Sequence, residues 1–152
     1  MRGLGRLNGL FRPRAALSAD ELQTYADAVG PSIEQLGALY LRWRESLELD
    51  APDEQLANAG SIQRWQAAGL RDSLRRITPP PALARTHADL VAVATSTARA
   101  SQLLSNGYRF HSSSARCDGH ALLLSTEERL AALRAELERQ GLSVHHGPAG
   151  AE

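Results

Sequence analysis

Histidine, tyrosine and hydroxyl side chains fall at helical spacing in the middle of the sequence. His87, Thr97 and Ser101 share one apolar stripe, and Tyr25 occupies a matching position on an earlier stripe. An inward imidazole can ligate haem iron or a metal in a helical bundle, which makes these four side chains the candidates for a cofactor pocket. Bundle metal sites usually recruit Glu-x-x-His pairs, and the sequence has none. We therefore favour a neutral core histidine hydrogen-bonded to Tyr25, and we expect no cofactor.

A second group of possible ligands consists of His111, Cys117 and His120, in which Cys117-x-x-His120 has a metal-like spacing. A structural zinc site needs four ligands. The fourth would have to come from Asp118, His145 or His146. One Cys-x-x-His pair arises readily by chance, so we predict no metal site there. A catalytic Cys117–His120 dyad is disfavoured because no orienting group can be assigned.

No other catalytic pattern is present. The sequence has no phosphate-binding glycine loop, nucleophile elbow or metalloprotease motif. It contains 17 basic residues, all of them arginine, so a lysine Schiff base is impossible. We attribute the missing lysine to the codon use of a GC-rich, bacterial-like genome. The sequence therefore predicts a protein that is not an enzyme.

The first 19 residues carry a concentrated positive charge. They hold four arginines and no acid, or +4, whereas the rest holds 13 arginines and 17 acids, or −4. If the segment is helical, its apolar residues share one side, as in a peptide that docks on an anionic membrane surface or on a partner. Three glycines in nine residues disfavour a free helix, so a passive or self-packed arm stays equally open. The candidate partner-binding residues are Arg2, Arg6, Phe11, Arg12 and Arg14.

Residues 107–117, GYRFHSSSARC, mix aromatic and basic groups without a usable period. Such a mixture is typical of a surface that stacks on bases, and equally of a loop folded over the end of a bundle with Phe110 tucked in. The formal net charge of the chain is zero, whereas nucleic-acid binders usually show a basic field. We therefore favour the loop and find no specific nucleic-acid signal.

The spacing of apolar residues predicts the helices that would position these groups. Ser18 to Glu21 is a capping box, and the apolar residues after it are spaced three and four apart as far as Leu47. Gly30-Pro31 interrupts this pattern and predicts a kink or a break. A second stripe runs through Leu56, Ala59, Ile62, Trp65 or Gln66, Leu70, Leu74 and Ile77. The triple proline at 79–81 ends it.

We expect a third helix over residues 82–106, which ends at Asn106-Gly107, and a fourth within residues 118–140. The fourth stripe consists of Leu123, Leu130, Leu133 and Leu137, and a second capping box at Ser125 offers Thr126 as an alternative start. The third helix has small residues such as Ala94 and Thr97 in its middle, and we expect Trp65 and Tyr40 to fill the space opposite them.

These elements predict an all-α fold, an antiparallel four-helix bundle with up-down-up-down order. The bundle would span residues 18–141, between the arm of residues 1–17 and a flexible tail of residues 142–152. No apolar run approaches the roughly 20 residues that cross a bilayer. The single cysteine favours a reducing, cytoplasmic location.

The function that this pattern favours is a non-enzymatic interaction or scaffold module. Its partner would be another protein or a second copy of the chain, and residues 1–17 or 107–117 would meet it. The alternative is a bundle that binds a small molecule or cofactor, haem or metal, in a pocket near His87 and the third helix.

Overall fold

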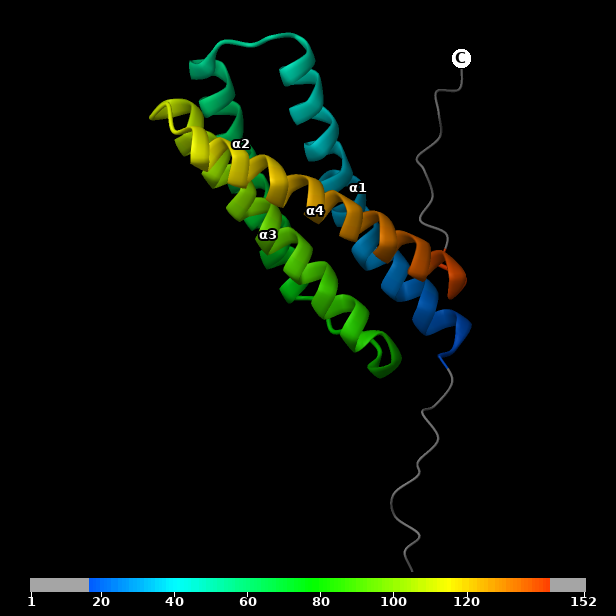
Figure 1. Ribbon diagram of the computed structural model, residues 1–152. Helices are drawn as coiled ribbons and strands as arrows, with labels where there is room; N and C mark the ends of the chain where they lie inside the picture. The colour runs from blue at the N-terminus through cyan, green and yellow to red at the C-terminus, as the bar shows by residue number, and fades with distance from the viewer. Residues whose placement is uncertain (1–16, 143–152) are drawn as a thin grey trace, which may run out of the picture.

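A computed structural model describes residues 17–142 of the chain, which form four long α-helices that pack against one another (Figure 1). The elements are α1 (Ala19–Glu48), α2 (Asp53–Arg75), the 3-10 turn η1 (Pro81–Leu83), α3 (Ala84–Arg109) and α4 (Ser113–Arg139). Residues 17–142 contain no strand, so the predicted all-α bundle of four helices is confirmed. Within this range no helix combines the length and the apolar character that a membrane crossing requires.

The first helix begins where the capping box predicts. The Ser18 hydroxyl accepts a hydrogen bond from the Glu21 backbone N–H, and the Glu21 carboxylate accepts one from the Ser18 N–H, both at 3.1 Å. Pro31 lies inside α1 and does not divide it. A proline removes one helical hydrogen bond, but the buried stripe of Val29 and Ile33 continues across it and packing keeps the helix intact.

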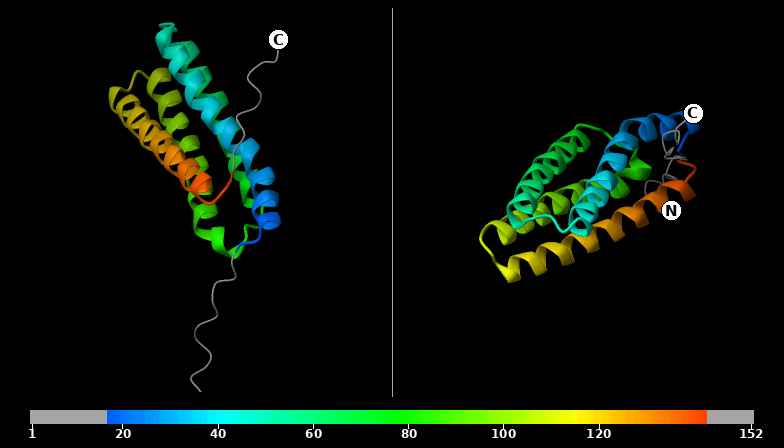
Figure 2. Two further views of the ribbon diagram at one scale, coloured as in Figure 1. Left: turned by 90° about the vertical axis from the view of Figure 1, so that its right-hand side faces the viewer. Right: turned by 90° about the horizontal axis from the view of Figure 1, so that it is seen from above.

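Successive helices run in opposite directions, and α3 lies between α2 and α4 (Figures 1 and 2). The helix α3 approaches both neighbours closely, whereas α1 stands further off. Glycines permit the close approach. A Cβ on Gly60 of α2 would lie 3.0 Å from the backbone of α3, and one on Gly119 of α4 would lie 2.8 Å from Leu104 of α3.

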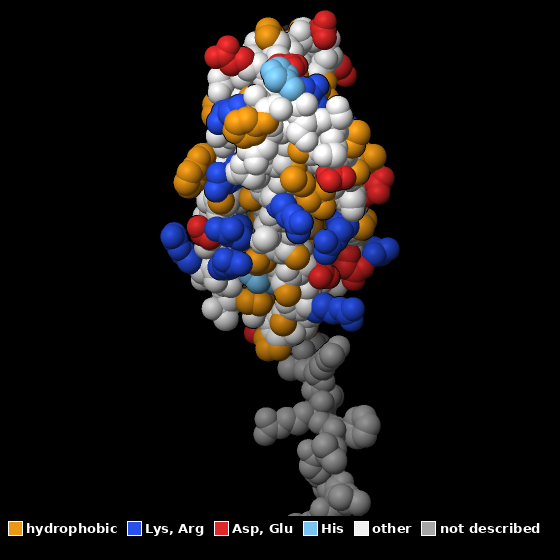
Figure 3. Space-filling model, turned by 60° about the vertical axis from the view of Figure 1, so that its left-hand side comes forward, with side chains coloured by type: hydrophobic (Ala, Val, Ile, Leu, Met, Phe, Trp, Pro, Cys, Tyr) orange, Lys and Arg blue, Asp and Glu red, His pale blue; other side chains and the backbone are white. Residues whose placement is uncertain are grey.

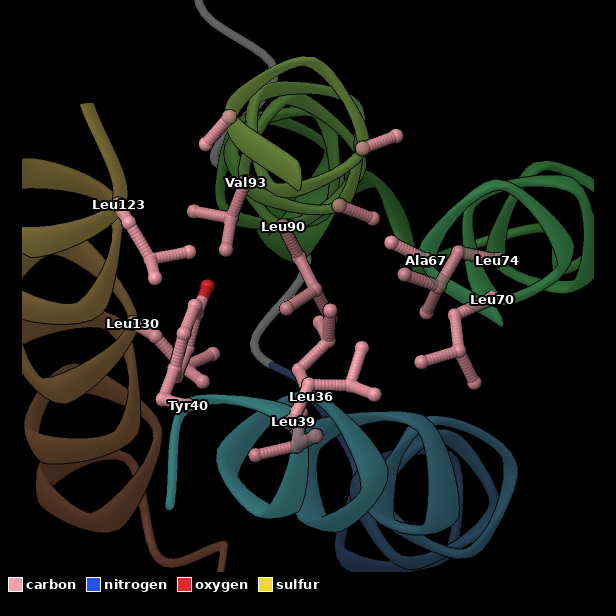
Figure 4. Packing of buried hydrophobic residues seen from close by; sticks show 14 of the residues in the cluster. Leu36, Leu39, Tyr40, Ala67, Leu70, Leu74, Leu90, Val93, Leu123 and Leu130 are labelled. Carbon is pink, nitrogen blue, oxygen red and sulfur yellow. The ribbon is translucent and has the colours of Figure 1, made fainter. Parts of the chain in front are cut away.

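Large side chains of α1 fill the space between α1 and the other three helices. Figure 4 shows Leu36, Leu39 and Tyr40 pointing from α1 into the interior. They meet residues of the other three helices, among them Leu70, Leu74, Leu90, Val93, Leu123 and Leu130. Large residues on one side against small ones on the other give the dense packing of a protein core.

The predicted stripe of α2 is wrong in its middle. Trp65 is 68% exposed and Ile62 is 58% exposed. The buried positions of α2 are Leu56, Ala57, Gly60, Gln63, Ala67, Leu70 and Leu74. Close contact with α3 requires small residues at the seam, so α2 turns Gly60 and Ala67 inward and leaves the indole outside. Tyr40 alone takes the position opposite Thr97 that the sequence pattern assigned to both Tyr40 and Trp65.

The predicted loop at residues 107–117 is also wrong. The helix α3 continues to Arg109 and α4 begins at Ser113, so only residues 110–112 connect them. Gly107 sits inside α3, where its missing Cβ admits the backbone of Arg116. His111 takes the positive φ of 54° that ends the helix, and the Ser112 hydroxyl caps α4. Phe110 is 71% exposed and is not tucked over the bundle.

The arm and the tail lie almost wholly outside the described residues. Leu17 packs against the core, and Leu142 is buried in it. Residues 1–16 and 143–152 are not described, and the candidates Arg2, Arg6, Phe11, Arg12 and Arg14 lie among them.

Two glycines of α2 offer a matched test of the seam. We expect Gly60→Ala to lower the free energy of unfolding by about 1–3 kcal/mol, because the new methyl group meets the backbone of α3. Gly69→Ala should raise it by about 0.5–1 kcal/mol, because a Cβ there meets open space and alanine favours a helix. Urea unfolding measures both, and equal effects would contradict the close approach.

The two tryptophans should differ in the same assay. Trp43 is 2% exposed, so Trp43→Ala should cost about 3–5 kcal/mol, the usual loss for a buried large aromatic side chain. Trp65→Ala should cost less than about 1 kcal/mol, because the indole is largely in solvent. A large loss on Trp65→Ala would mean that the side chain is packed.

Candidate functional site

His87 lies where α1, α2 and α3 meet, and both of its ring nitrogens are hydrogen-bonded. Its Nε2 is 2.9 Å from the carbonyl oxygen of Leu74, which can only accept, so Nε2 donates. In the neutral ring Nδ1 then accepts from the Tyr25 hydroxyl, 3.1 Å away. The imidazole therefore ties the three helices together. The expected hydrogen bond to Tyr25 is present, and an axial-ligand role would require one of the two bonds to break.

The other two cofactor candidates belong to a separate network. The Thr97 hydroxyl donates to the Val93 carbonyl at 2.8 Å, so the Tyr40 hydroxyl donates to Thr97 Oγ1 at 2.7 Å. Ser101 is fully buried, and its Oγ has no hydrogen-bond partner in the described part of the chain. Tyr25 lines a surface hollow of about 430 Å³ between the start of α1 and residues 77–80, but His87, Thr97 and Ser101 do not line it.

The three metal candidates are not brought together. His111 Nδ1 lies 3.3 Å from Asp53 Oδ2, and His120 Nε2 lies 3.0 Å from the Tyr108 hydroxyl. Cys117 is exposed on α4. Within residues 17–142 no three His, Cys, Asp or Glu side chains are grouped so that they could hold a metal ion.

Sequence reasoning missed an aromatic cluster at the end of the bundle where α3 meets α4. The rings of Trp43, Tyr108 and His120 have centroids 6.0–6.2 Å apart. Burial lowers the pKa of His120, which favours the neutral ring. The Trp43 Nε1 is buried without a hydrogen-bond partner among the described residues. Tyr108 comes four residues after the buried Leu104, a spacing that could have placed it on the core stripe.

Arg116 joins this cluster to the start of α2. Its guanidinium carbon lies 4.8 Å from the Tyr108 ring centroid, its Nε donates to the Gly107 carbonyl at 3.0 Å, and its Nη2 is 3.4 Å from Asp53. An outer groove of about 340 Å³ adjoins these groups. Its lining residues are Asp53, Glu54, Ala57, Asn58, Tyr108, Arg109 and His111. Because it mixes acids and bases, it offers no strong net charge to a ligand.

A larger groove of about 440 Å³ lies between α1 and α2. Leu39 and Leu70 contribute buried apolar side chains to its lining, while Trp65 lines it and is mostly exposed. Arg42 reaches across from α1 and donates to Gln66 at 3.3 Å. A Cβ on Gly69, another lining residue, would meet nothing within 4 Å. The lining also includes Gln35 and Ser73, so the groove is a recess of mixed polar and apolar character next to a projecting indole.

The buried tyrosines should make stability depend on alkaline pH. Burial raises the pKa of Tyr25 and of Tyr40 to about 12 each, above the ordinary value near 10. A folded-state pKa above the unfolded one means that the stabilisation is complete below pH 10 and is lost as the pH rises toward 12. The thermal midpoint should fall across that range, and absorbance should show these two phenols ionising late. Ionisation of all three tyrosines near pH 10 in the folded protein would contradict this.

The described residues thus combine two closed hydrogen-bond networks, an aromatic cluster tied by Arg116, and an open groove beside Trp65. No model of a known protein family matches the chain, and no match exists among curated proteins or solved structures. The function must therefore be inferred from the geometry of these residues.

Proposed function

We propose that the protein is a non-enzymatic interaction module that associates with a second copy of itself through the groove between α1 and α2. In this proposal Trp65 of each copy enters the groove of the other. The observation that carries it is a projecting indole beside a recess into which Leu39 and Leu70 contribute apolar side chains.

A self-complementary face is what a symmetric dimer requires. In a two-fold interface each subunit presents the same patch, so a projection and a recess side by side can each be filled by the partner. In such a dimer the indole and the recess of each subunit are both occupied, so neither remains free to bind further copies and form a filament. Trp65 and the groove satisfy this condition on a single pair of helices.

Burial of exposed apolar side chains on α2 would supply the free energy of association. Trp65 and Ile62, one turn apart on α2, are both more than half exposed. Tryptophan is among the residues that most often dominate interface energies, because it buries about 150–250 Å². Association also costs about 4–15 kcal/mol of lost freedom, so we expect a modest, micromolar dimer.

The alternative function, a small-molecule or cofactor binder near His87, has less support. Both nitrogens of His87 are engaged by Tyr25 and Leu74, so a ligand would have to displace one of them. The groove between α1 and α2 needs no such rearrangement. The proposal assigns no catalytic residue, and a cytoplasmic location stays a prediction from the single cysteine.

Sedimentation equilibrium over the micromolar range tests the proposal. We expect the apparent mass of the wild type to rise with concentration, and Trp65→Ala to weaken the dimer at least tenfold because the indole is removed. Gly69→Arg should do the same from the other side, because it fills the recess at a position with free space. Leu124→Ala is the matched control, since Leu124 is 59% exposed on α4.

Two results would overturn the proposal. One is a wild type that stays monomeric at every concentration. The other is a dimer that Leu124→Ala weakens as much as Trp65→Ala does. A variant with Trp43→Phe leaves Trp65 as the sole indole. Its emission should shift to the blue as the protein concentration rises only if Trp65 enters the interface.

A further inference from the structure

Three arginines of α2 and two of α3 are open to solvent or half-buried. We call this set, Arg64, Arg71, Arg75, Arg85 and Arg99, the arginine face. On α2 its members are spaced seven and four residues apart, so they share one side of the helix. Four of the five are classed as exposed, and Arg71 is half-buried.

The register between the two helices brings these arginines to matching levels. The Ser105 hydroxyl donates to the Ala57 carbonyl at 2.8 Å, and His87 Nε2 donates to the Leu74 carbonyl at 2.9 Å. These two bonds place Arg75 near the level of Arg85 and Arg64 near the level of Arg99. The arginine face therefore has a pair of guanidinium groups near each end, with Arg71 between them.

The bundle is electrically polarised, although the chain has no net charge. Residues 60–100 hold six arginines and two aspartates, or +4, whereas α1 holds two arginines and six acids, or −4. Within the described residues, Arg71 is the one member of the arginine face in an ion pair, with Asp72 at 3.0 Å. Figure 3 shows many blue side chains over the middle and lower part of this side of the molecule, with fewer red ones among them toward the right.

We propose that the arginine face binds the phosphate backbone of nucleic acid without sequence preference. From Arg64 to Arg75 the face extends about 16 Å along the helix. At about 3.4 Å per phosphate along one strand, that length faces about five phosphates, a density of negative charge that matches a row of guanidinium groups. A guanidinium group can also donate two parallel hydrogen bonds to two oxygens of one phosphate.

Two other anionic partners fit this surface less well. A membrane surface would bind apolar side chains as well as charge. The large exposed apolar residues of α2 and α3 are Ile62 and Trp65, and Trp65 contacts one member of the arginine face, Arg64, at 5.3 Å from its ring centroid. An acidic protein would present separate carboxylates rather than a continuous line of charge. Because Arg64 lies over the Trp65 ring, the variants that separate nucleic-acid binding from self-association change Arg75, Arg85 and Arg99 and leave Arg64 in place.

Fluorescence anisotropy of the full chain with labelled duplex DNA and single-stranded RNA of mixed sequence tests this proposal at several salt concentrations. Two triple variants each remove three positive charges. The face variant is Arg75→Gln, Arg85→Gln and Arg99→Gln. The control is Arg44→Gln, Arg129→Gln and Arg139→Gln, on α1 and α4. Both retain residues 1–17, so binding by the basic arm is the same in each, and thermal midpoints confirm that both fold.

We expect the wild type to bind duplex DNA with an affinity that falls with salt, at a logarithmic slope of about −4.5 for five phosphate contacts. The face variant should weaken binding at least tenfold and reduce the slope by about two to three. The control should change binding by less than twofold. Trp65→Ala removes the ring under Arg64 but no charge, so it should change binding by less than twofold, whatever its effect on self-association.

Several results would overturn the proposal. They include no binding at low salt, equal losses in the two triple variants, and binding to phosphatidylserine vesicles in place of nucleic acid. Displacement of DNA by poly-glutamate at equal charge concentration would also overturn it, because it would indicate a surface for acidic proteins.

Discussion

The close approach of α3 to α2 and α4 is the constraint on which the rest of the bundle depends. It is possible only because Gly60, Gly107 and Gly119 lack a Cβ where a neighbouring backbone or side chain passes within about 3 Å. Three helices then form a tight layer, and α1 stands off from it. The gap is filled by large side chains of α1 such as Tyr40 and Trp43, which are buried against the smaller residues of the layer.

Polar groups in that gap must be paired, and the hydroxyls of Tyr25 and Tyr40 are. One donates to His87 and the other to Thr97, so α1 is joined to α3 by two directional bonds as well as by packing. Such bonds specify one register, because a sliding helix would leave buried donors without acceptors. Among the described residues the buried indole N–H of Trp43, the Ser101 hydroxyl and Arg134 Nε have no such partner, and Trp43 lies at the end where the aromatic cluster meets Arg116.

The same geometry separates the surfaces on which the two proposals rest. Because α1 stands away from α2, a groove with a partly apolar lining remains between them, and Trp65 is one of its lining residues. Because α2 and α3 lie tightly together, their arginines are close along the helix pair, while the acids of α1 lie on a different helix. A protein that has no net charge can therefore present a strongly basic surface.

Local chemistry in the sequence alone determined the number and type of the elements. The capping box at Ser18, the prolines at 79–81 and apolar spacings of three and four act within a few residues, and the helices they predict are present. Pairing of His87 with Tyr25 was also predictable, since a buried imidazole needs a partner. Tertiary structure decided which face of α2 turns inward. The apolar pattern alone predicts that Trp65 is buried, but the close contact with α3 requires small residues such as Gly60 on the inner face. It also decided that α3 continues through Gly107. The glycine is needed there because the backbone of Arg116 packs against it, and that contact exists only after α4 has folded back onto α3.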